Sequence, residues 1–325
     1  DTGGALGPLA VEARGGPDAG EQEQQDAVLL NGLQYGVLLF LLAAGLTLVF
    51  GIMSFVNLAH GSLYMVGAYA AALAYGAGGS FTLAMLTAMA AALAVGLILE
   101  TTVVSRLYRR DHLDHVLATF GLVMFFNEAV RIVWGPQPLF VQVPESLVGA
   151  VDLLGFGYPL YRFAIIVAGL VVAIGSYLLI HKTRVGMLIR AGAQNPQMVA
   201  ALGIPIGLLN ALLFGVGAML AGVAGAMAGP VLSVQSGMGD AVLITTLVVI
   251  VIGGIGSVTG AFYAALIVGV VDPMGRVYLP LLLRQVADRS VADAAGPALA
   301  SMSVYLLMAL VLALRPQGLF PAHRT

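Results

Sequence analysis

Long apolar segments with almost no charge are the feature that most restricts how this chain can fold. A transmembrane helix needs about 20 predominantly apolar residues. Such segments lie at about 28–50, 58–78, 81–100, 116–134, 162–180, 206–228, 240–256, 260–275 and 296–314. Only 9% of the 325 residues are charged, whereas ordinary soluble domains carry roughly 25%. So much apolar surface requires lipid, and the chain is predicted to be an integral membrane protein.

The predicted fold is an all-α polytopic bundle with about eight to nine transmembrane helices. The segments 240–256 and 260–275 look short for a full crossing, which indicates that some helices are broken or re-entrant. The 42 glycines suit close helix packing and irregular backbone inside such a bundle. The glycines predicted to break helices or to pack closely are Gly51, Gly61, Gly253, Gly254, Gly256 and Gly260.

The chain divides into a tail, a membrane domain and a short end. Residues 1–27 are polar, and their first 26 residues contain six acids and one arginine. No signal-peptide pattern is visible there, and the segment is predicted to be an external, disordered tail. Residues 28–320 form the predicted membrane domain, and residues 321–325 form a short cytoplasmic tail.

The basic residues indicate the orientation of the bundle, because loops rich in Lys and Arg stay in the cytoplasm. Loops 101–115 and 181–205 each carry three Lys or Arg residues and are predicted to be cytoplasmic. Loop 135–161, between them, carries acids and no basic residue, as an outer loop would. This orientation places the N-terminus outside and the C-terminus inside.

One segment disagrees with this orientation. Three arginines fall in a loop that the count of helices places outside, namely Arg276, Arg284 and Arg289. Either nearby acids offset them, or a crossing near 240–275 is miscounted. The acids in question are Asp272, Asp288 and Asp293.

The second basic loop has a readable local structure. A helix is predicted from Arg184 to Ala193. Asn195 then serves as the N-cap of a second short helix, with Pro196 at its first position and Gly203 at its end. Because proline disfavours helical geometry in the residue before it, the two helices meet at a bend. Such a rigid knob suits contact with another protein better than catalysis.

Two groups of polar residues lie in the predicted spans, where polar side chains are costly and usually face the bundle interior or a pathway. The first group is Ser54, Asn57 and His60. It either lines a substrate pathway or satisfies backbone groups at a helix break. The second group is Asn127, Glu128 and Arg131. It either contacts a zwitterionic substrate or contains a simple ion pair between residues one helical turn apart.

The sequence contains no pattern for an ATP site, a metal centre or a catalytic nucleophile. It has no GxxxxGK[ST] motif, and Lys182 is its only lysine. The run GGIGSVTG at 253–260 lacks the context of a nucleotide loop and suits helix contact. With no cysteine, thiolate chemistry is excluded, and His112 with His115 is interpreted as a solvated surface cluster. The chain is therefore predicted not to be an enzyme.

Four stretches carry a family resemblance. They are TRVGMLIRAGAQNPQMVAALGI at 183–204, GIMSFVNLAHGSLYMVGAY at 51–69, VVIVIGGIGSVTGAFYAALIVG at 248–269 and RPQGLF at 315–320. Through them, about residues 28–320 resemble bacterial ABC-importer permeases, and in particular the LivH-like permeases of the branched-chain amino acid type. The first stretch is similar to the cytoplasmic coupling loop of those permeases.

The resemblance implies a transport subunit of the bacterial inner membrane with no bound cofactor of its own. ATP and Mg²⁺ would be bound by cytoplasmic ATP-binding subunits. A second related permease subunit would form a heterodimer or homodimer with this chain, and a periplasmic substrate-binding protein would deliver the cargo. The lipid bilayer is the remaining partner, and no nucleic acid is expected.

The resemblance further implies that the cargo is a branched-chain or other small amino acid, with urea or a short amide as alternatives. A self-sufficient secondary transporter or channel is the competing class. It would need titratable groups inside the membrane, where the spans offer few beyond His60, Glu128 and Asp272. The residues implied to couple the knob to the ATPase are Arg184, Gly186, Arg190, Asn195, Met198, Ala200, Leu202 and Gly203.

Overall fold

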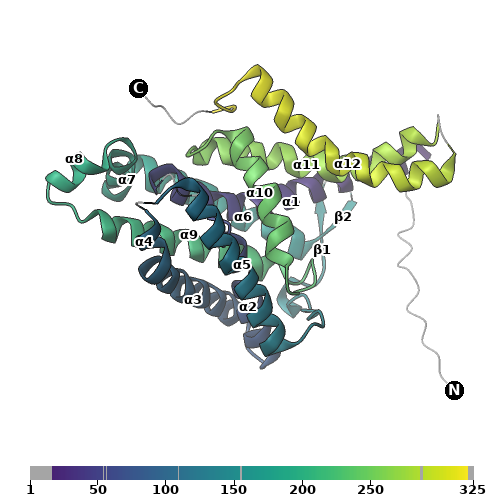
Figure 1. The fold of residues 1–325 in the computed structure, drawn as a ribbon. Coiled ribbons are helices and arrows are strands. Elements are labelled where there is room, and N and C mark those ends of the chain that lie inside the picture. The colour runs from purple at the N-terminus through teal and green to yellow at the C-terminus, as the bar shows by residue number, and fades with distance from the viewer. Residues whose placement is uncertain are drawn as a thin grey trace.

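Helices dominate the computed structural model, which describes residues 17–53, 55, 57–108, 110–153, 156–285 and 288–320 (Figure 1). The longer helices are α1 Pro17–Met53, α2 His60–Gly76, α3 Phe81–Leu99, α5 His112–Trp134, α6 Leu160–Lys182, α9 Ile206–Ala228, α10 Met238–Gly253, α11 Val258–Leu283 and α12 Arg289–Leu314. The shorter ones are α4 Ser105–Leu107, α7 Arg184–Gln194 and α8 Pro196–Ala201. A π-helix, Glu100–Val104, joins α3 to α4, and a 3-10 helix, Glu145–Leu147, precedes the strands β1 Ala150–Leu153 and β2 Phe156–Pro159.

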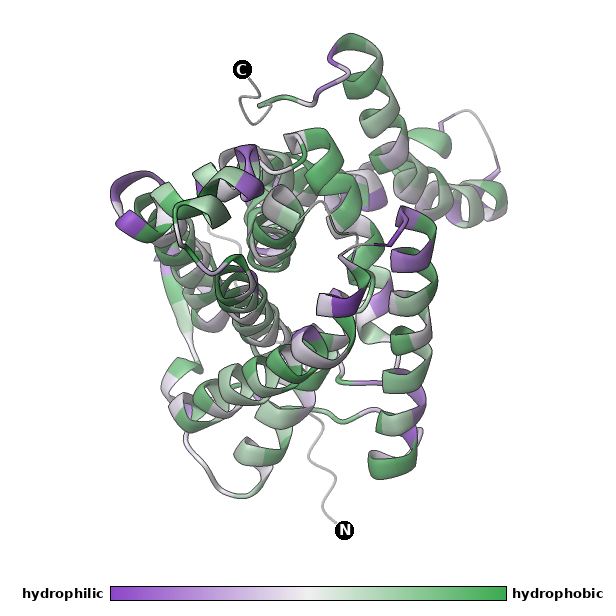
Figure 2. Ribbon diagram, turned by 60° about the vertical axis from the view of Figure 1, so that its left-hand side comes forward, coloured by the Kyte–Doolittle hydropathy of each residue, from purple (hydrophilic) through white to green (hydrophobic). Residues whose placement is uncertain are grey.

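Each apolar segment predicted from the sequence coincides with one of the longer helices. Within the described residues, seven helices are long and apolar enough to cross a membrane. Helices α2 and α10 are shorter, with 17 and 16 residues. Figure 2 shows apolar residues along most of the helical surface. An all-α polytopic membrane protein is therefore confirmed, while the number of full crossings stays a prediction.

Helix α11 is longer than the sequence indicated. The predicted segment 260–275 ended near Pro273, but the helix continues through Pro273 and Pro280 to Leu283. A proline inside a membrane helix removes one backbone hydrogen bond, and neighbouring helices make this tolerable. The prediction of a short segment is thus wrong for α11, which has 26 residues, and correct for α10.

Helix α1 lies at the centre of the bundle. It begins at Pro17, inside the predicted tail 1–27, and the part of that tail before Pro17 lies outside the described residues, as do residues 321–325. Every residue from 36 to 49 is buried, because α6, α9, α10 and α11 all pack against this helix. The core of the molecule is therefore built around α1.

Pairs of glycines hold the central helices in backbone contact. At each pair, a Cβ added to one glycine would overlap the backbone of the other. Such close approach is typical of membrane bundles, where small residues let helices gain dispersion contacts and weak backbone interactions. The pairs are Gly36 with Gly269 (α1 and α11), Gly45 with Gly217 (α1 and α9), and Gly67 with Gly222 (α2 and α9).

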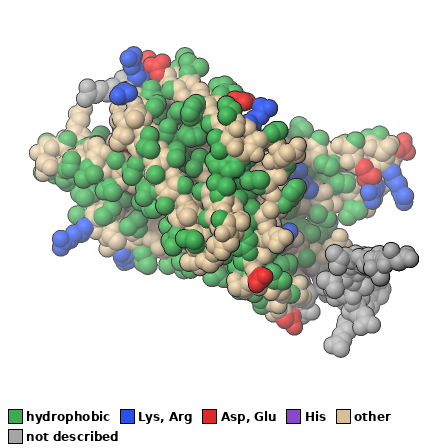
Figure 3. Space-filling model, turned by 90° about the horizontal axis from the view of Figure 1, so that it is seen from below, with side chains coloured by type: hydrophobic (Ala, Val, Ile, Leu, Met, Phe, Trp, Pro, Cys, Tyr) green, Lys and Arg blue, Asp and Glu red, His purple; other side chains and the backbone are tan. Residues whose placement is uncertain are grey.

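The arginines that disagreed with the predicted orientation are largely paired with acids. Arg276 Nε lies 2.9 Å from Asp272 Oδ2, and Arg284 Nη2 lies 2.7 Å from Asp293 Oδ1. Acids therefore pair with two of the three arginines, and both explanations of the disagreement stay open. In Figure 3, charged side chains lie mainly at the margins of the visible face, and its middle is largely apolar.

Replacing Gly67 by alanine tests the glycine contacts. The new methyl group would overlap the backbone of Gly222, and overpacking of this kind costs about 1–3 kcal/mol. We expect Gly67→Ala to lower the melting temperature of the purified protein in detergent. Gly175→Ala is the matched control, since nothing lies within 4 Å of its Cβ position on α6. Equal melting temperatures for the two variants would contradict the role of the glycine contacts.

Candidate functional site

The second basic loop folds as two short helices with the predicted caps. Asn195 Oδ1 accepts a hydrogen bond from Met198 N at 2.9 Å, and Pro196 is the first residue of α8. Gly203 follows α8 with a φ of 83°, a conformation that glycine adopts readily. One cap was missed by the sequence analysis: the side chain of Thr183 accepts a hydrogen bond of 3.0 Å from the first turn of α7.

One face of α7 attaches residues 184–203, here called the knob, to the rest of the molecule. Ile189 is buried in a cluster with two leucines of α9, and Met53 at the end of α1 packs against it. Gly186 is buried where a Cβ would overlap carbonyl oxygens at the end of α6. Arg190 of α7 donates a hydrogen bond to the carbonyl of Ile180, which lies near the end of α6. Gly186 and Arg190 therefore fix the knob to its own chain.

The outer face of the knob is apolar and exposed. Met198 and Leu202 are 59% and 73% exposed, and Arg184 and Ala200 are also exposed, whereas Val199 points inward and is buried. The two helices form one end of the molecule (Figure 1). Exposed apolar side chains grouped in this way are typical of a surface that contacts another protein or the membrane.

The first predicted polar group lies between α1 and α2. Asn57 and His60 are 1% and 0% exposed, and among the described residues neither side chain has a partner with good hydrogen-bond geometry. Ser54 lies outside the described residues. A buried polar group without a partner costs about 1–3 kcal/mol, so we expect these two side chains to add little to the stability of the fold.

Gly61, the residue after His60, brings α2 into contact with α10. Gly61 and Gly239 are so close that a Cβ on either would overlap the backbone of the other. Both glycines lie in the first turns of their helices, and neither helix has a side-chain cap. The N-terminal turns of two helices therefore meet inside the bundle.

Asn127 of α5 reaches the same turn of α10. Its Nδ2 donates to Asp240 Oδ2 at 2.9 Å, and its Oδ1 accepts a hydrogen bond from Gly237 N at 3.2 Å. Ser236 Oγ donates to the backbone carbonyl of Asn127 at 3.2 Å. Asp240 was not among the predicted site residues, although an acid in the first turn of a helix is a recognisable signal. The first turn of α10 is thus contacted by α2 and by α5.

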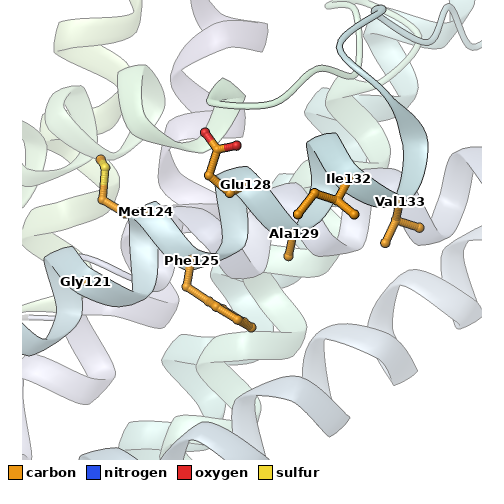
Figure 4. A pocket seen from close by; sticks show the side chains of 7 residues that line it. All are labelled: Gly121, Met124, Phe125, Glu128, Ala129, Ile132 and Val133. Carbon is orange, nitrogen blue, oxygen red and sulfur yellow. The ribbon is translucent and has the colours of Figure 1, made fainter.

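Glu128 and Arg131 do not join this cluster. They form an ion pair of 2.9 Å on α5, with side chains 62% and 53% exposed. Glu128 lies in an open groove of about 650 Å³ (Figure 4). The groove is lined by Gly121, Met124, Phe125, Glu128, Ala129, Ile132 and Val133. These residues recur every three to four positions, so the groove follows one face of α5.

The groove face of α5 is mostly apolar, but it does not suit contact with lipid. Phe125 and Ile132 are largely exposed on it, and Glu128 lies between them within the candidate span His112–Trp134. A charged side chain facing lipid costs most at the centre of a helix, about 2.5–3.5 kcal/mol, and less at Glu128, which lies near the end of α5 beside Arg131. A second protein surface or a water-filled path would lower that cost. At Glu128, a polar or hydrated covering suits this face better than acyl chains.

The glycine-rich stretch at 253–260 forms a break between α10 and α11. Gly254 and Gly256 have φ values of 105° and 82°, which only glycine adopts easily. The chain end covers this break, because Leu319 N and Phe320 N donate to the last carbonyls of α10 at 2.8 and 3.0 Å. Across the break Gly253 touches Gly260, and Gly51 of α1 lies against Gly256. The stretch packs helices together and does not form a phosphate loop.

The prediction of a solvated surface cluster at His112 and His115 is wrong for His115. That side chain is 4% exposed, and its Nε2 lies 2.8 Å from the carbonyl of Leu107. Its ring packs 4.6 Å from the ring of Phe55. Burial and the nearby Glu100 carboxylate raise the pKa of Tyr108 in the same region. Within the described residues, no group of three or more potential ligands is placed to hold a metal ion.

Comparisons with a family model and with known proteins point to the same family. Residues 28–314 match the family described as branched-chain amino acid transport system / permease component. The chain is 31% identical to the high-affinity branched-chain amino acid transport system permease protein BraD of Pseudomonas aeruginosa, over 90% of this chain and 94% of that protein. It is 28% identical to the corresponding permease protein LivH of Salmonella typhimurium, over 77% of this chain and 86% of that protein.

One solved structure has a weaker similarity to this chain, both in sequence and in fold. It is the complex described as PsaBC from Streptococcus pneumoniae in complex with Fab, with a TM-score of 0.48 and 11% sequence identity. The similarity covers 91% of this chain and 98% of that chain.

Replacing Asn57 by leucine tests whether this amide has a structural role. Leucine has a similar shape, and it removes an unpaired buried amide that costs about 1–3 kcal/mol. We expect Asn57→Leu to keep or raise the melting temperature in detergent. Thr47→Val is the control, because Thr47 is also buried with an unpaired hydroxyl. A fall of several degrees in Asn57→Leu alone would show that the amide stabilises the helix break.

Proposed function

Because the chain belongs to the family of branched-chain amino acid transport system permease components, we propose that it is the transmembrane subunit of an ATP-driven importer. The family match over residues 28–314 carries this proposal. The bundle of apolar helices supports a multi-pass protein of the bacterial inner membrane. Hydrolysis of ATP would be performed by other subunits, since the sequence has no phosphate-binding motif.

The knob is the proposed docking surface for cytoplasmic ATPase subunits. Met198 and Leu202 present apolar side chains outward, and Arg184 adds a positive charge beside them. The buried side of α7 is anchored to α1, α6 and α9, so force applied to the knob would reach the transmembrane helices directly. Movement of the ATPases would in this way shift the bundle between outward-open and inward-open states.

The groove face of α5 is the proposed contact with a second, related permease subunit. Aromatic and aliphatic side chains with two small residues form a helix-packing surface along it. Glu128 in its middle needs a polar or hydrated environment, which a translocation path between two subunits would supply. A heterodimer and a homodimer would both cover this face.

The proposed cargo is a branched-chain or other small amino acid. Glu128 and Arg131 offer one charge of each sign to a zwitterion, and the apolar groove around Glu128 suits an aliphatic side chain. Urea or a short amide is the alternative cargo, and it would not need the charges. A self-sufficient secondary transporter is less well supported, because Asp272 is already paired with Arg276.

The end of the molecule opposite the knob is the proposed docking side for a periplasmic substrate-binding protein. Loop 135–161 lies there and carries the hairpin of β1 and β2. Leu139 in this loop pairs with Val234 through two backbone hydrogen bonds of 2.8 and 2.9 Å. The loop is thereby joined to the segment that leads into α10. Binding at this surface could thus influence the first turn of α10.

A pull-down of the tagged chain from native membranes tests the class of the transporter. We expect a P-loop ATPase and a second permease to be recovered and identified by mass spectrometry. Recovery of this chain alone, from membranes that express the neighbouring genes, would favour the secondary transporter.

Leu202→Asp tests the docking surface on the knob. A carboxylate in an apolar contact would remain unpaired, and we expect at least a tenfold loss of co-purified ATPase. Phe140→Asp is the control, because Phe140 is as exposed but lies in loop 135–161. The permease itself should reach the membrane in both variants. Normal ATPase recovery with Leu202→Asp would remove the knob from the proposed interface.

Glu128→Gln tests recognition of the zwitterion. Loss of a charge-assisted hydrogen bond costs about 1.5–3 kcal/mol, so we expect the apparent KM for leucine uptake to rise at least tenfold. Asp114→Asn is the matched control, because Asp114 is an exposed acid at the other end of α5. An unchanged KM in Glu128→Gln, together with competition by urea, would support the alternative cargo.

A further inference from the structure

Helix α5 is only lightly attached to the bundle. Its buried residues are few, namely His115, Thr119, Val123 and Val130. The glycines that join the central helices have no counterpart here, since nothing lies within 4 Å of the Cβ position of Gly121. An element with so few buried contacts can move at low cost relative to the glycine-packed core.

The main polar attachment of α5 is the cluster around Asn127. Among the described residues, Asn127 makes the one side-chain to side-chain hydrogen bond between α5 and another element, the 2.9 Å contact with Asp240. The Gly237 N–H and the Ser236 hydroxyl add bonds of 3.2 Å each. The groups that contact Asn127 belong to one short region, residues 236–240, and a second polar attachment of α5 is the contact of His115 Nε2 with the carbonyl of Leu107.

Asn127 and Glu128 are neighbours that lie on different faces of α5. The Asn127 side chain bonds to the first turn of α10, and the Glu128 side chain lies in the groove. Consecutive residues on a helix point about 100° apart, so a rotation or shift of α5 moves both together. The state of the bond to Asp240 therefore sets the position of Glu128.

The first turn of α10 is also connected to the knob. Ile189 of the knob is buried in a cluster that Met53 contacts, and Met53 also packs on the cluster that contains Phe55. The chain from Phe55 leads within a few residues to Gly61, which touches Gly239 beside Asp240. Displacement of the knob can therefore reach this turn through packed groups.

We propose that Asn127 and Asp240 form a releasable latch between α5 and α10, which opens in each transport cycle and lets α5 carry Glu128 from one side of the path to the other. This inference rests on the proposed function as an importer. Asp240 acts in it as a positioning residue, because it holds Asn127 and does not itself line the groove. The latch is polar, and the buried apolar residues of α5 are Val123 and Val130, so opening the latch exposes a small apolar surface.

Reversible cross-linking tests the latch in the assembled complex. The chain has no cysteine, so Asn127→Cys with Asp240→Cys introduces two unique thiols. ATP-dependent leucine uptake is measured in proteoliposomes before and after treatment with a short bis-methanethiosulfonate, and again after reduction. We expect the cross-link to lower uptake at least tenfold and reduction to restore it, while the ATPase subunits remain bound. The two single-cysteine variants control for modification of one thiol.

Uptake that persists in the cross-linked complex would overturn the latch, since α5 and α10 would not need to separate. A wrong proposed function would give a different result: the complex with the natural sequence would show no ATP-dependent uptake at all.

A second pair of variants decides the question if the double-cysteine protein is inactive before treatment. Asp240→Asn retains an oxygen that can accept from Asn127, and Asp240→Leu does not. We expect Asp240→Leu to raise the ATP hydrolysed per leucine transported at least fivefold, and Asp240→Asn to keep this ratio close to that of the natural sequence. Melting temperatures of both variants separate this effect from unfolding. Equal ratios in the two variants would overturn the latch.

Discussion

Backbone contact between helices is the constraint on which the rest of this molecule depends. In lipid, helices gain little from burying apolar side chains, and close packing of small residues supplies dispersion contacts instead. The glycine pairs Gly36–Gly269 and Gly45–Gly217 press α11 and α9 onto α1, and this places α1 where all its middle turns are buried. Larger side chains could not reproduce this spacing. The position of every helix that packs on α1 follows from it.

This packing divides the molecule into a rigid core and a looser helix. Within the core, Asn57 and His60 are buried, and neither side chain has a hydrogen-bond partner with good geometry among the described residues. Helix α5 lies beside the core with one face largely exposed and carries the charged pair Glu128–Arg131 there. A helix with few packing constraints thus presents an exposed ion pair within a span.

The sequence predicted the helices and the knob, because both depend on local signals. Apolar length placed each long helix, and Asn195 with Pro196 placed the start of α8. Long-range contacts were harder to predict. Helix α11 continued through Pro273 because its neighbours support it, His115 was buried by Phe55 from a distant segment, and Asp240 acquired its importance only through Asn127. A single sequence contains no direct signal for such pairings.

The meeting of two helix N-termini explains why an acid is found at α10. The first turns of α2 and α10 touch through Gly61 and Gly239, and neither is capped by a side chain. Each N-terminus carries a partial positive charge of about half a unit, and burial increases their mutual repulsion. Asp240 places a carboxylate in the first turn of α10 and so offsets part of that repulsion. Since the same carboxylate accepts the hydrogen bond from Asn127, the electrostatic balance of this junction depends on where α5 lies.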